Sequence, residues 1–295
     1  MRLDPVSLRL FVAVMEEGTI AAAAVREHLA PAAVSRRLSE LESGLGVVLF
    51  ERSNKGTQAT PAAHSLLGLE RGVLHGLDDI AEQMAGFASG LRGHVRVSAN
   101  ISAITQFLPE DLRSFMALAP QVQVHLQERI STQVARAVAD STADIGILNA
   151  GSYGESLVQL PYRQDELVLV VPRGHVLARR RPVAFREALA HDIVGLHAGS
   201  AMNELLHRGA AEAGLPLRLR MQVTSYDALC LMVDAGMGIG VLPLGSARLY
   251  LPALKIRAVA LAEVWAVRQL VLAVRSVEAL SPASRVLVEH LRGVG

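Results

Sequence analysis

The stretch HLAPAAVSRRLSELE, residues 28–42, places two arginines side by side after a run of small residues. Pro31 predicts the start of a helix, because proline is tolerated in a first helical turn but not inside a helix. The apolar face repeats at spacings of four, three and four, at Val34, Leu38, Leu41 and Leu45. The outward face carries Ala32, Ser35, Arg36 and Ser39, with Arg37 at its flank. The small side chains permit close approach of another surface, and the guanidinium groups of Arg36 and Arg37 can then bind to that surface.

Two shorter helices are expected before this one. SLRLFVAVMEEG, residues 7–18, has apolar residues at helical spacing, with Ser7 as its N-cap and Gly18 at its end. Thr19 can cap a second helix over residues 20–29. Two short helices joined by a tight turn, the second with small residues and arginine near its start, are typical of a helix-turn-helix that enters the major groove. From these residues alone, a surface helix with two solvated arginines explains the pattern equally well.

The segment that follows decides between these interpretations. VVLFER, residues 47–52, predicts a strand, SNKG a polar tip and TQAT a returning strand. A hairpin beside a recognition helix is a wing, which lies against the sugar-phosphate backbone. The run from Leu8 to Leu66 resembles the winged helix-turn-helix domain of LysR-type transcriptional regulators, through LFVAVMEEGTIAAAA, AVSRRLSELESGLGVVLFERSNKGTQATPA and their spacing. The DNA-binding residues expected from this pattern are Pro31, Ala32, Ser35, Arg36, Arg37, Ser39, Arg52, Ser53, Asn54 and Lys55.

The sequence departs from the family pattern at two places. Ala30-Pro31-Ala32 stands where the family usually has Ser-Gln-Pro or Ser-Pro-Ser, so base recognition is expected from Ser35 and Arg36. Thr60-Pro61-Ala62-Ala63 stands where the pattern is Thr-Pro-x-Gly, a change that affects helix geometry. The expected winged domain covers residues 1–60, with the helix-turn-helix over about 19–38 and the wing over about 51–59.

Residues 61–90 predict one long helix. Its apolar positions repeat largely in steps of three and four, at Leu66, Val73, Leu77, Ile80, Met84 and Phe87. A single exposed helix of this length needs a partner, so we expect a homodimer through it and, from the resemblance, a dimer of dimers. Glu70 interrupts the seam. Gly68, Gly72 and Gly76 each cost about 1 kcal/mol against alanine, which close approach of two backbones would explain. The alternative is a helix packed on its own C-terminal domain.

The remaining sequence, residues 93–295, alternates between strand and helix patterns, which predicts an α/β domain with mostly parallel sheets. Strands are expected at HVRVSA, VQVHLQE, ADIGIL, ELVLVVP, DIVGLH, IGVLP and QLVLAVR, and helices at LPEDLRSFMALA, TQVARAVADS, AMNELLHRGAAEAG, SYDALCLMVDAG and SPASRVLVEHLRG. The pattern also resembles the effector-binding domain of the same regulators, which is related in fold to periplasmic solute-binding proteins. The resemblance implies two subdomains, residues 93–161 with 267–295, and residues 162–266.

Short polar residues stand where the expected strands end and helices begin. Ligands of open α/β sheets bind at this edge, where helix N-termini present free N–H groups. Any one serine or threonine there can simply cap its own helix. Their convergence would form a site for a small carboxylate or similar anion, and Ser102 and Ser131 match family positions that commonly hold the effector. The expected effector-binding residues are Asn100, Ser102, Ser131, Thr132, His197, Ser200 and Ser225.

Composition limits the other functions that the chain can have. The net charge of its 295 residues is +1, so DNA binding must depend on where the charges lie. The sequence has no apolar run of membrane-spanning length and no signal-peptide pattern at its N-terminus, so we expect a cytoplasmic protein. The single cysteine, Cys230, agrees with a reducing compartment, and its apolar neighbours favour a buried residue over a redox sensor.

An enzyme and a plain solute-binding protein are the alternatives. GMGIG, residues 236–240, precedes a strand-like segment and not a helix, so it fails as a dinucleotide loop. GxSxG, HExxH and zinc-type cysteine–histidine spacings do not occur, so we expect no catalytic residue, metal or cofactor. The missing export signal and the winged segment argue against a plain solute-binding protein. The prediction is a multidomain regulator of promoter DNA, with a mainly α winged helix-turn-helix, a linker helix and an α/β effector-binding domain.

Overall fold

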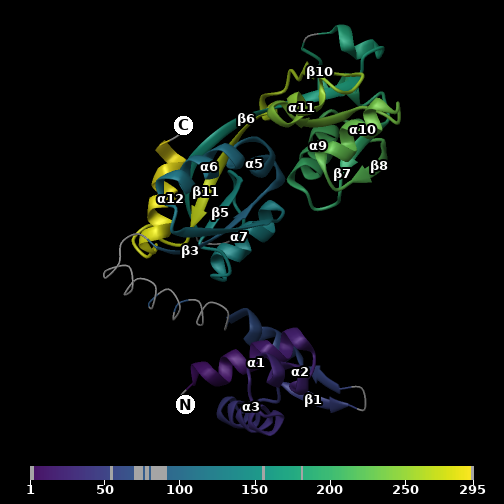
Figure 1. The fold of residues 1–295 in the computed structure, drawn as a ribbon. Helices are drawn as coiled ribbons and strands as arrows, with labels where there is room; N and C mark the ends of the chain where they lie inside the picture. Colours follow the sequence, from purple (N-terminus) through teal and green to yellow (C-terminus); the bar gives the residue numbers. More distant parts are fainter. Residues whose placement is uncertain are drawn as a thin grey trace. The chain divides into compact units, whose positions relative to one another are not determined.

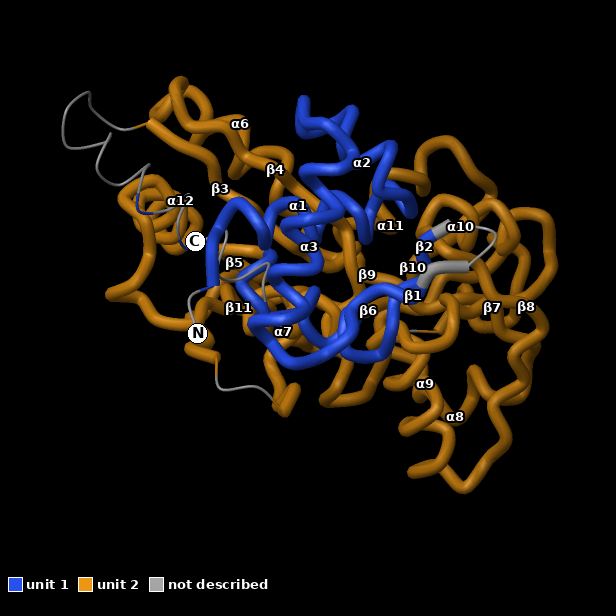
Figure 2. The backbone as a smooth tube through the Cα atoms, turned by 90° about the horizontal axis from the view of Figure 1, so that it is seen from below, with its two compact units in different colours: residues 1–88, 140–142 blue, residues 89–139, 143–295 orange. Residues whose placement is uncertain are grey.

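The computed structural model describes residues 3–53, 56–69, 76, 80, 92–154, 157–180 and 182–293. The chain divides into two compact units, residues 1–88 with 140–142 and residues 89–139 with 143–295 (Figure 2). Within the described ranges, none of the helices combines the length and the apolar character that crossing a membrane requires.

The N-terminal unit begins with α1 (Pro5–Glu17), whose first turn differs from the prediction. Asp4, and not Ser7, is the N-cap: its carboxylate accepts the backbone N–H groups of Val6 and Ser7. The Ser7 hydroxyl donates to the same carboxylate at 2.9 Å. The prediction of Ser7 as the N-cap was wrong. Pro5 has no N–H to satisfy, so the helix begins at Pro5, and the Asp4 carboxylate directly before it accepts the next free N–H groups.

The predicted helix-turn-helix is present as α2 (Ile20–Arg26) and α3 (Pro31–Leu45). Thr19 caps α2 as expected, by accepting the N–H of Ala22 at 3.1 Å. The apolar face of α3 packs with α1 and α2, and its fully buried members are Val34, Leu38 and Leu41. The predicted core face of α3 is therefore confirmed.

The predicted hairpin is also present, as the antiparallel pair β1 (Phe50–Ser53) and β2 (Gly56–Ala59). The Glu42 carboxylate, on α3, accepts the N–H groups of Leu49 at 2.7 Å and Phe50 at 3.0 Å. These two bonds fix the start of the hairpin to α3, so the sequence that shapes the helix also positions the wing.

Residues 61–69 form a helix that starts at Pro61, with the Thr60 hydroxyl accepting the N–H of Ala63 at 3.2 Å. Of the predicted apolar seam, Leu66 is half-buried in the core of this unit and Ile80 is 59% exposed. The other seam positions, Val73, Leu77, Met84 and Phe87, lie outside the described residues, as do Glu70 and Gly72.

The larger unit is built on a seven-stranded sheet, with order β10-β6-β11-β5-β3-β4 and with β9 also paired to β6, and on a two-stranded sheet of β7 and β8 (Figure 1). The strands are β3 (Gly93–Ala99), β4 (Val122–Glu128), β5 (Ile145–Asn149), β6 (Val158–Pro172), β7 (Ile193–Leu196), β8 (Leu219–Val223), β9 (Gly240–Pro243), β10 (Ile256–Ala260) and β11 (Val267–Val274). The helices are α5 (Ile101–Gln106), α6 (Leu108–Leu118), α7 (Ser131–Ala139), α8 (Phe185–Ala188), α9 (Ala201–Glu212), α10 (Tyr226–Asp234), α11 (Leu244–Tyr250) and α12 (Pro282–Gly293). Two short 3₁₀ helices are η1 (Val176–Arg179) and η2 (Val264–Ala266).

The expectation of mostly parallel sheets was wrong. β3 pairs in parallel with β4 and β5, and β7 with β8, but β6 and β11 form antiparallel pairs with each other and with their other neighbours. The reason lies in the path of the chain. β6 leaves one half of the unit and β11 returns to it, so two strands that run side by side between the halves must point in opposite directions.

Two hydrophobic cores divide this unit into a first lobe and a second lobe. The first core includes Tyr162, from β6, and Leu270, from β11. The second core includes Leu167, from β6, together with Ala266, which directly precedes β11. Both strands therefore pass from one lobe to the other within a few residues. At these crossings the side chains of Asp165, on β6, and Arg268, on β11, are buried.

The first lobe has helices on both faces of its sheet. On β5, Ile147 packs in the core that contains α6 and α12, whereas the next residue, Leu148, packs with α7. Successive strand residues point to opposite faces, so this alternation places α7 across the sheet from α6 and α12. β5 therefore reads as a continuous apolar run because both of its faces are buried.

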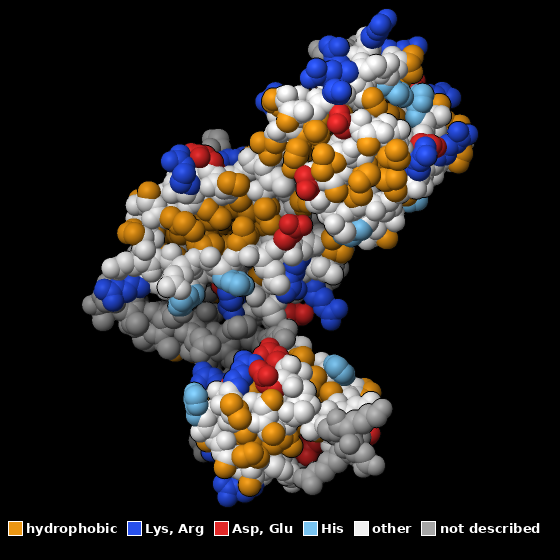
Figure 3. All heavy atoms as spheres, turned by 45° about the vertical axis from the view of Figure 1, so that its right-hand side comes forward, with side chains coloured by type: hydrophobic (Ala, Val, Ile, Leu, Met, Phe, Trp, Pro, Cys, Tyr) orange, Lys and Arg blue, Asp and Glu red, His pale blue; other side chains and the backbone are white. Residues whose placement is uncertain are grey.

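Basic side chains gather at the tip of the second lobe, around η1 and β10 (Figure 3). The exposed members are Arg173, Arg179, Arg180, Lys255 and Arg257. Arg180 pairs with Glu187 there. The net charge of +1 therefore conceals a local concentration of positive charge.

Candidate functional sites

The exposed face of α3 contains the predicted recognition residues. Pro31, Ala32 and Ser39 are exposed and Ser35 is half-buried. The Arg36 side chain is 75% exposed, and its guanidinium is 3.8 Å from the Glu40 carboxylate, one turn further along the helix. Arg36 is thus free to reorient toward a partner.

Arg37 has a different environment from its neighbour. Its guanidinium donates to the Asp4 carboxylate at 2.8 Å, and its side chain is 38% exposed. Since Asp4 also caps α1, this ion pair joins the start of α1 to α3. The structure therefore separates the two arginines, which the sequence placed together, into one exposed side chain and one that is held by a carboxylate.

The wing provides the remaining predicted DNA-binding residues. Arg52 and Ser53 lie in β1, paired with Thr57 and Gly56. Asn54 and Lys55 lie outside the described residues.

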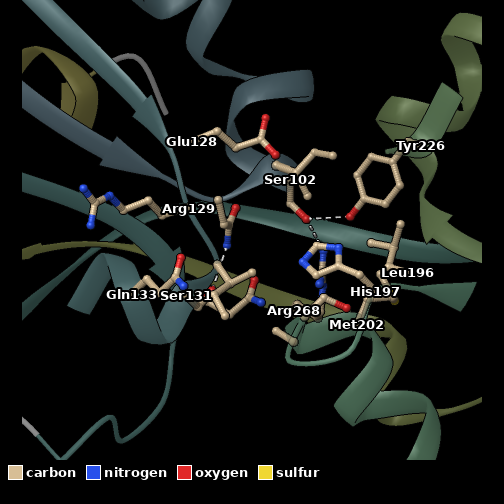
Figure 4. Close-up of a pocket in the computed structure, with 16 residues that line it drawn as sticks. Ser102, Glu128, Arg129, Ser131, Gln133, Leu196, His197, Met202, Tyr226 and Arg268 are labelled. Atoms are coloured by element: carbon tan, nitrogen blue, oxygen red, sulfur yellow. Dashed lines mark hydrogen bonds between the residues drawn. The ribbon is translucent and has the colours of Figure 1, made fainter. Parts of the chain in front are cut away.

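A cavity of about 230 Å³ lies between the two lobes of the larger unit, and we call it the inner chamber (Figure 4). Residues of the first lobe that line it include Asn100, Ser102 and Ser131. The second lobe contributes His197 and Ser200. These five predicted residues therefore line one space, although they come from separate strand–helix junctions.

A hydrogen-bond network joins the lobes at the side of the inner chamber. The Ser102 and Tyr226 hydroxyls are 3.0 Å apart, and Arg268 donates to Ser102 at 3.1 Å. Arg268 also donates to the Asp165 carboxylate, through Nε at 2.9 Å and through Nη2. Burial raises the pKa of Tyr226, so its phenol keeps its proton and can donate a hydrogen bond.

Three helix N-termini face the inner chamber. Asn100 caps α5, and its side-chain amide donates to the Ser131 hydroxyl, at the start of α7, at 3.2 Å. Ser200 caps α9 by accepting the N–H of Asn203 at 3.2 Å. Each helix N-terminus carries roughly half a positive charge, so together they favour an anion in the chamber.

Two polar atoms among the lining residues lack the hydrogen bond that burial demands. Nδ1 of His197 and Oδ1 of Asn149 are buried without a partner among the described residues. An unmet buried hydrogen bond costs about 1–3 kcal/mol. A polar ligand or a water molecule in the cavity would satisfy either atom.

Two predicted residues lie elsewhere. Ser225 does not line the inner chamber, because its hydroxyl caps its own helix, α10, at the N–H of Ala228. The next residue, Tyr226, reaches the chamber instead. Thr132 lines only a second cavity. Arg268 was missed altogether, since its importance depends on β11 crossing between the lobes.

The second cavity has a volume of about 480 Å³, and we call it the outer chamber. It shares Ser131, Asn149, Ala201 and Arg268 with the inner chamber. The lining that belongs to it alone includes Thr132, Ala150, Tyr153, Glu204, Leu205, Arg208, Trp265, Val267 and Gln269.

Cys230 is fully buried in the core of the second lobe. Burial raises the pKa of its thiol to about 12. The thiolate is the reactive form of cysteine, so this side chain behaves as a small hydrophobic residue at neutral pH.

Comparisons with known proteins agree with this architecture. Residues 88–295 match the LysR substrate binding domain, and residues 6–64 match the family described as bacterial regulatory helix-turn-helix protein, lysR family. The uncharacterized HTH-type transcriptional regulator YbhD of Escherichia coli (strain K12) is 26% identical over 284 residues, which cover 96% of this chain and 89% of that protein. The HTH-type transcriptional regulator ClcR of Pseudomonas putida is 33% identical over 162 residues, which cover 55% of each protein.

The fold is also that of a solved regulator. The crystal structure of full-length CbnR complexed with its target DNA matches with a TM-score of 0.76 and 23% identity, covering 99% of this chain and 100% of that chain. Proteins of this family are transcriptional regulators and not enzymes. The chain therefore belongs to the LysR family, as a DNA-binding transcriptional regulator with a helix-turn-helix domain and an effector-binding domain.

Proposed function

We propose that this regulator recognises a promoter through α3 and the wing, and that a small anion in the inner chamber controls it. One observation carries the effector part of the proposal. Ser102, Ser131 and Ser200, from the N-terminal ends of three different helices, line a single cavity that both lobes enclose. A ligand held by both lobes changes how they sit against each other, which gives binding a structural consequence.

The charge balance of the inner chamber supports an anion. The positive charge of Arg268 is already compensated by Asp165, whose side chain is only 1% exposed. Arg129 and Glu128, which also line the chamber, carry opposite charges. The helix N-termini are the remaining source of potential, and their partial charges are positive. A carboxylate of small size meets these requirements.

The difference between Arg36 and Arg37 supports base or backbone contact through Arg36. An exposed guanidinium can bind guanine bidentately, for about 1–3 kcal/mol of discrimination, or contact a phosphate. Arg37 would first have to leave Asp4, so we assign it to the support of α3. Residues 61–90 would supply the helix of the homodimer, and two dimers would pair further. The site of action is the cytoplasm, because the DNA target lies there.

DNA binding is tested with the region upstream of the regulator's own gene, against random competitor DNA and over a salt series. We expect Arg36→Ala to weaken specific binding by about ten-fold or more. Arg113→Ala is the matched control, because the Arg113 side chain has the same 75% exposure but lies on α6 of the other unit. Equal affinity of Arg36→Ala and wild type would rule out this recognition surface.

Effector binding is tested by thermal unfolding of the full-length protein with sodium salts of small carboxylates, acetate and succinate first. A ligand at one hundred times its Kd stabilises the folded state by about 2.7 kcal/mol. We expect Ser131→Ala to reduce the shift. Ser284→Ala is the control, since Ser284 is an equally buried hydroxyl on α12, outside both chambers. An equal loss in both variants would contradict the assignment.

A further inference from the structure

The two chambers differ in the chemistry of their walls. Hydroxyls and helix N-termini face the inner chamber, as described above. The outer chamber instead offers two aromatic rings, Tyr153 and Trp265, together with the aliphatic side chains of Leu205 and Val267. Polar side chains of this chamber, Glu204 and Arg208, are exposed and so stay in contact with solvent. The inner chamber has apolar side chains too, including Ile101, Leu196 and Met202. What distinguishes the outer chamber is its pair of aromatic rings.

The aromatic residues of the outer chamber are held in place. The Tyr153 hydroxyl donates to the backbone carbonyl of Asn149 at 2.7 Å, so its polar end is already satisfied. Trp265 packs edge-on against Phe185, with ring centroids 5.3 Å apart. Rings fixed in this way lose little conformational freedom when a ligand covers them, which favours binding of an apolar or aromatic group.

The two chambers adjoin each other. Ser131, Asn149, Ala201 and Arg268 line both of them, so the wall that separates the chambers is no thicker than these side chains. We propose that the effector is a two-part molecule, with a carboxylate in the inner chamber and an aromatic ring in the outer chamber against Tyr153 and Trp265. This inference rests on the proposed function, because it takes the inner chamber as the carboxylate site.

Two-part binding predicts a ranking of simple ligands. Acetate fills only the inner chamber, whereas 3-phenylpropanoate extends a ring on a short chain into the outer one. Burial of the ring would make 3-phenylpropanoate bind at least about ten-fold more tightly than acetate. Succinate, of similar chain length but with a second charge in place of the ring, would gain no such advantage because its second charge would be desolvated.

The chain contains its own probe for this site. Trp265 is the single tryptophan of the sequence, so tryptophan fluorescence of the full-length protein reports on the outer chamber. We would titrate the protein with acetate, succinate and 3-phenylpropanoate, and measure both emission and calorimetric affinity. The expected result is a saturable change in Trp265 emission with 3-phenylpropanoate, at the concentration that the calorimetric Kd predicts, and a smaller one with acetate.

Two variants distinguish binding in the outer chamber from binding in the inner chamber. Ala150→Phe places a ring inside the outer chamber, to which Ala150 contributes without lining the inner one. It should abolish the advantage of 3-phenylpropanoate over acetate and leave acetate binding within about two-fold of wild type. Ala211→Phe is the control, on an exposed position of α9 outside both chambers, and should keep the wild-type ranking.

The outcomes distinguish this inference from the proposed function. If acetate and 3-phenylpropanoate bind with equal affinity and Trp265 emission does not change, the two-part effector is refuted while the inner carboxylate site stands. If neither carboxylate binds, the inner site fails, and benzyl alcohol then tests the outer chamber alone. A saturable change with benzyl alcohol that Ala150→Phe removes would keep the ring site, and no change would refute it.

Discussion

Replacement of Asp165 by alanine is the most informative test of what joins the two lobes. Asp165 lies on β6 and Arg268 on β11, and their side chains are 1% and 11% exposed. Arg268 donates to the Asp165 carboxylate through Nε and Nη2, and Gln106 donates to it at 3.2 Å. Removal of the carboxylate would leave a buried guanidinium without a counter-charge, and the Gln106 amide with the Ser102 carbonyl as its remaining acceptor.

The expected cost follows from that geometry. Breaking a buried ion pair by removing one partner destabilises proteins by about 3–5 kcal/mol, because the other charge stays buried. We expect Asp165→Ala to lower the free energy of unfolding of the larger unit by that amount. The double variant Asp165→Leu with Arg268→Met, which removes both charges, should recover most of the loss.

Urea unfolding followed by tryptophan fluorescence measures this directly, since Trp265 lies in the larger unit and is the single tryptophan. Asp165 and Arg268 both lie in the larger unit. The helices of the N-terminal unit, followed by circular dichroism, therefore serve as an internal control that the substitution should leave folded. A loss below about 1 kcal/mol for Asp165→Ala, or a double variant no more stable than the single one, would refute the reasoning.

Three further predictions concern other parts of the chain. Tyr226→Phe removes one buried hydrogen bond to Ser102 and should cost about 1 kcal/mol in urea unfolding, a small loss because Arg268 still donates to that hydroxyl. Gly238→Ala should prevent stable folding, judged by soluble yield and circular dichroism, because Gly238 has φ +154° and an added Cβ would lie 2.5 Å from a backbone oxygen. Gly214→Ala, at φ +65° in open space, should still fold, at a cost of about 1–2 kcal/mol for the left-handed backbone. The hydrogen bond from Ser7 lowers the pKa of Asp4 below its ordinary value of 3.8. The Asp4 cap therefore stabilises α1 above pH 3.8, and this stabilisation is lost as the pH falls through the lowered pKa. An acid titration of wild type against Asp4→Asn, followed by circular dichroism, measures this loss.

The sequence predicted the elements with strong periodicity and missed those that depend on tertiary context. The apolar runs at β5 and β9 and the amphipathic pattern of α12 are confirmed, because burial alone shapes them. The first half of β6, residues 158–165, was missed. It contains Pro161 and charged side chains, and it becomes a strand only because β11 returns alongside it. Helix α5 was missed because six residues are too few to show a period.

The glycines of GMGIG show the same limit at the level of single residues. The sequence excluded a dinucleotide loop but gave no other role for the repeat. In the structure, Gly236 has φ +75° just after α10, and Gly238 lets the chain approach the carbonyl of Asp192. Gly240 lies in β9, where a Cβ would meet Leu229 at 2.5 Å. Each glycine answers a steric need that only the packed second lobe creates.

The candidate effector site likewise contains residues that the sequence predicted and residues that it did not. Serines at strand–helix junctions could be identified because capping requires small hydroxyl residues at those positions, and the fold then gathers several of them. Ser225 illustrates why the residue type alone is not enough: its hydroxyl turns back to its own helix, and the ring of Tyr226 reaches the chamber instead. Arg268 and Asp165 carried no local signal, since a buried charge pair on crossing strands looks like two ordinary surface charges in the sequence.

The contact between α5 and α11 shows why a ligand at the inner chamber can affect both lobes. The Thr105 and Ser246 hydroxyls, one on each helix, are 2.7 Å apart. Beside them Gly245 leaves no room for a side chain, because a Cβ there would lie 2.4 Å from the Gln106 amide oxygen. The nitrogen of that amide donates to the carbonyl of Ser102 and to Asp165. The lobes thus meet through close-packed polar groups that also border the effector site, and close-packed contacts switch between discrete arrangements more readily than they deform. A ligand that draws Ser102 toward itself therefore has to move the α5–α11 contact as well.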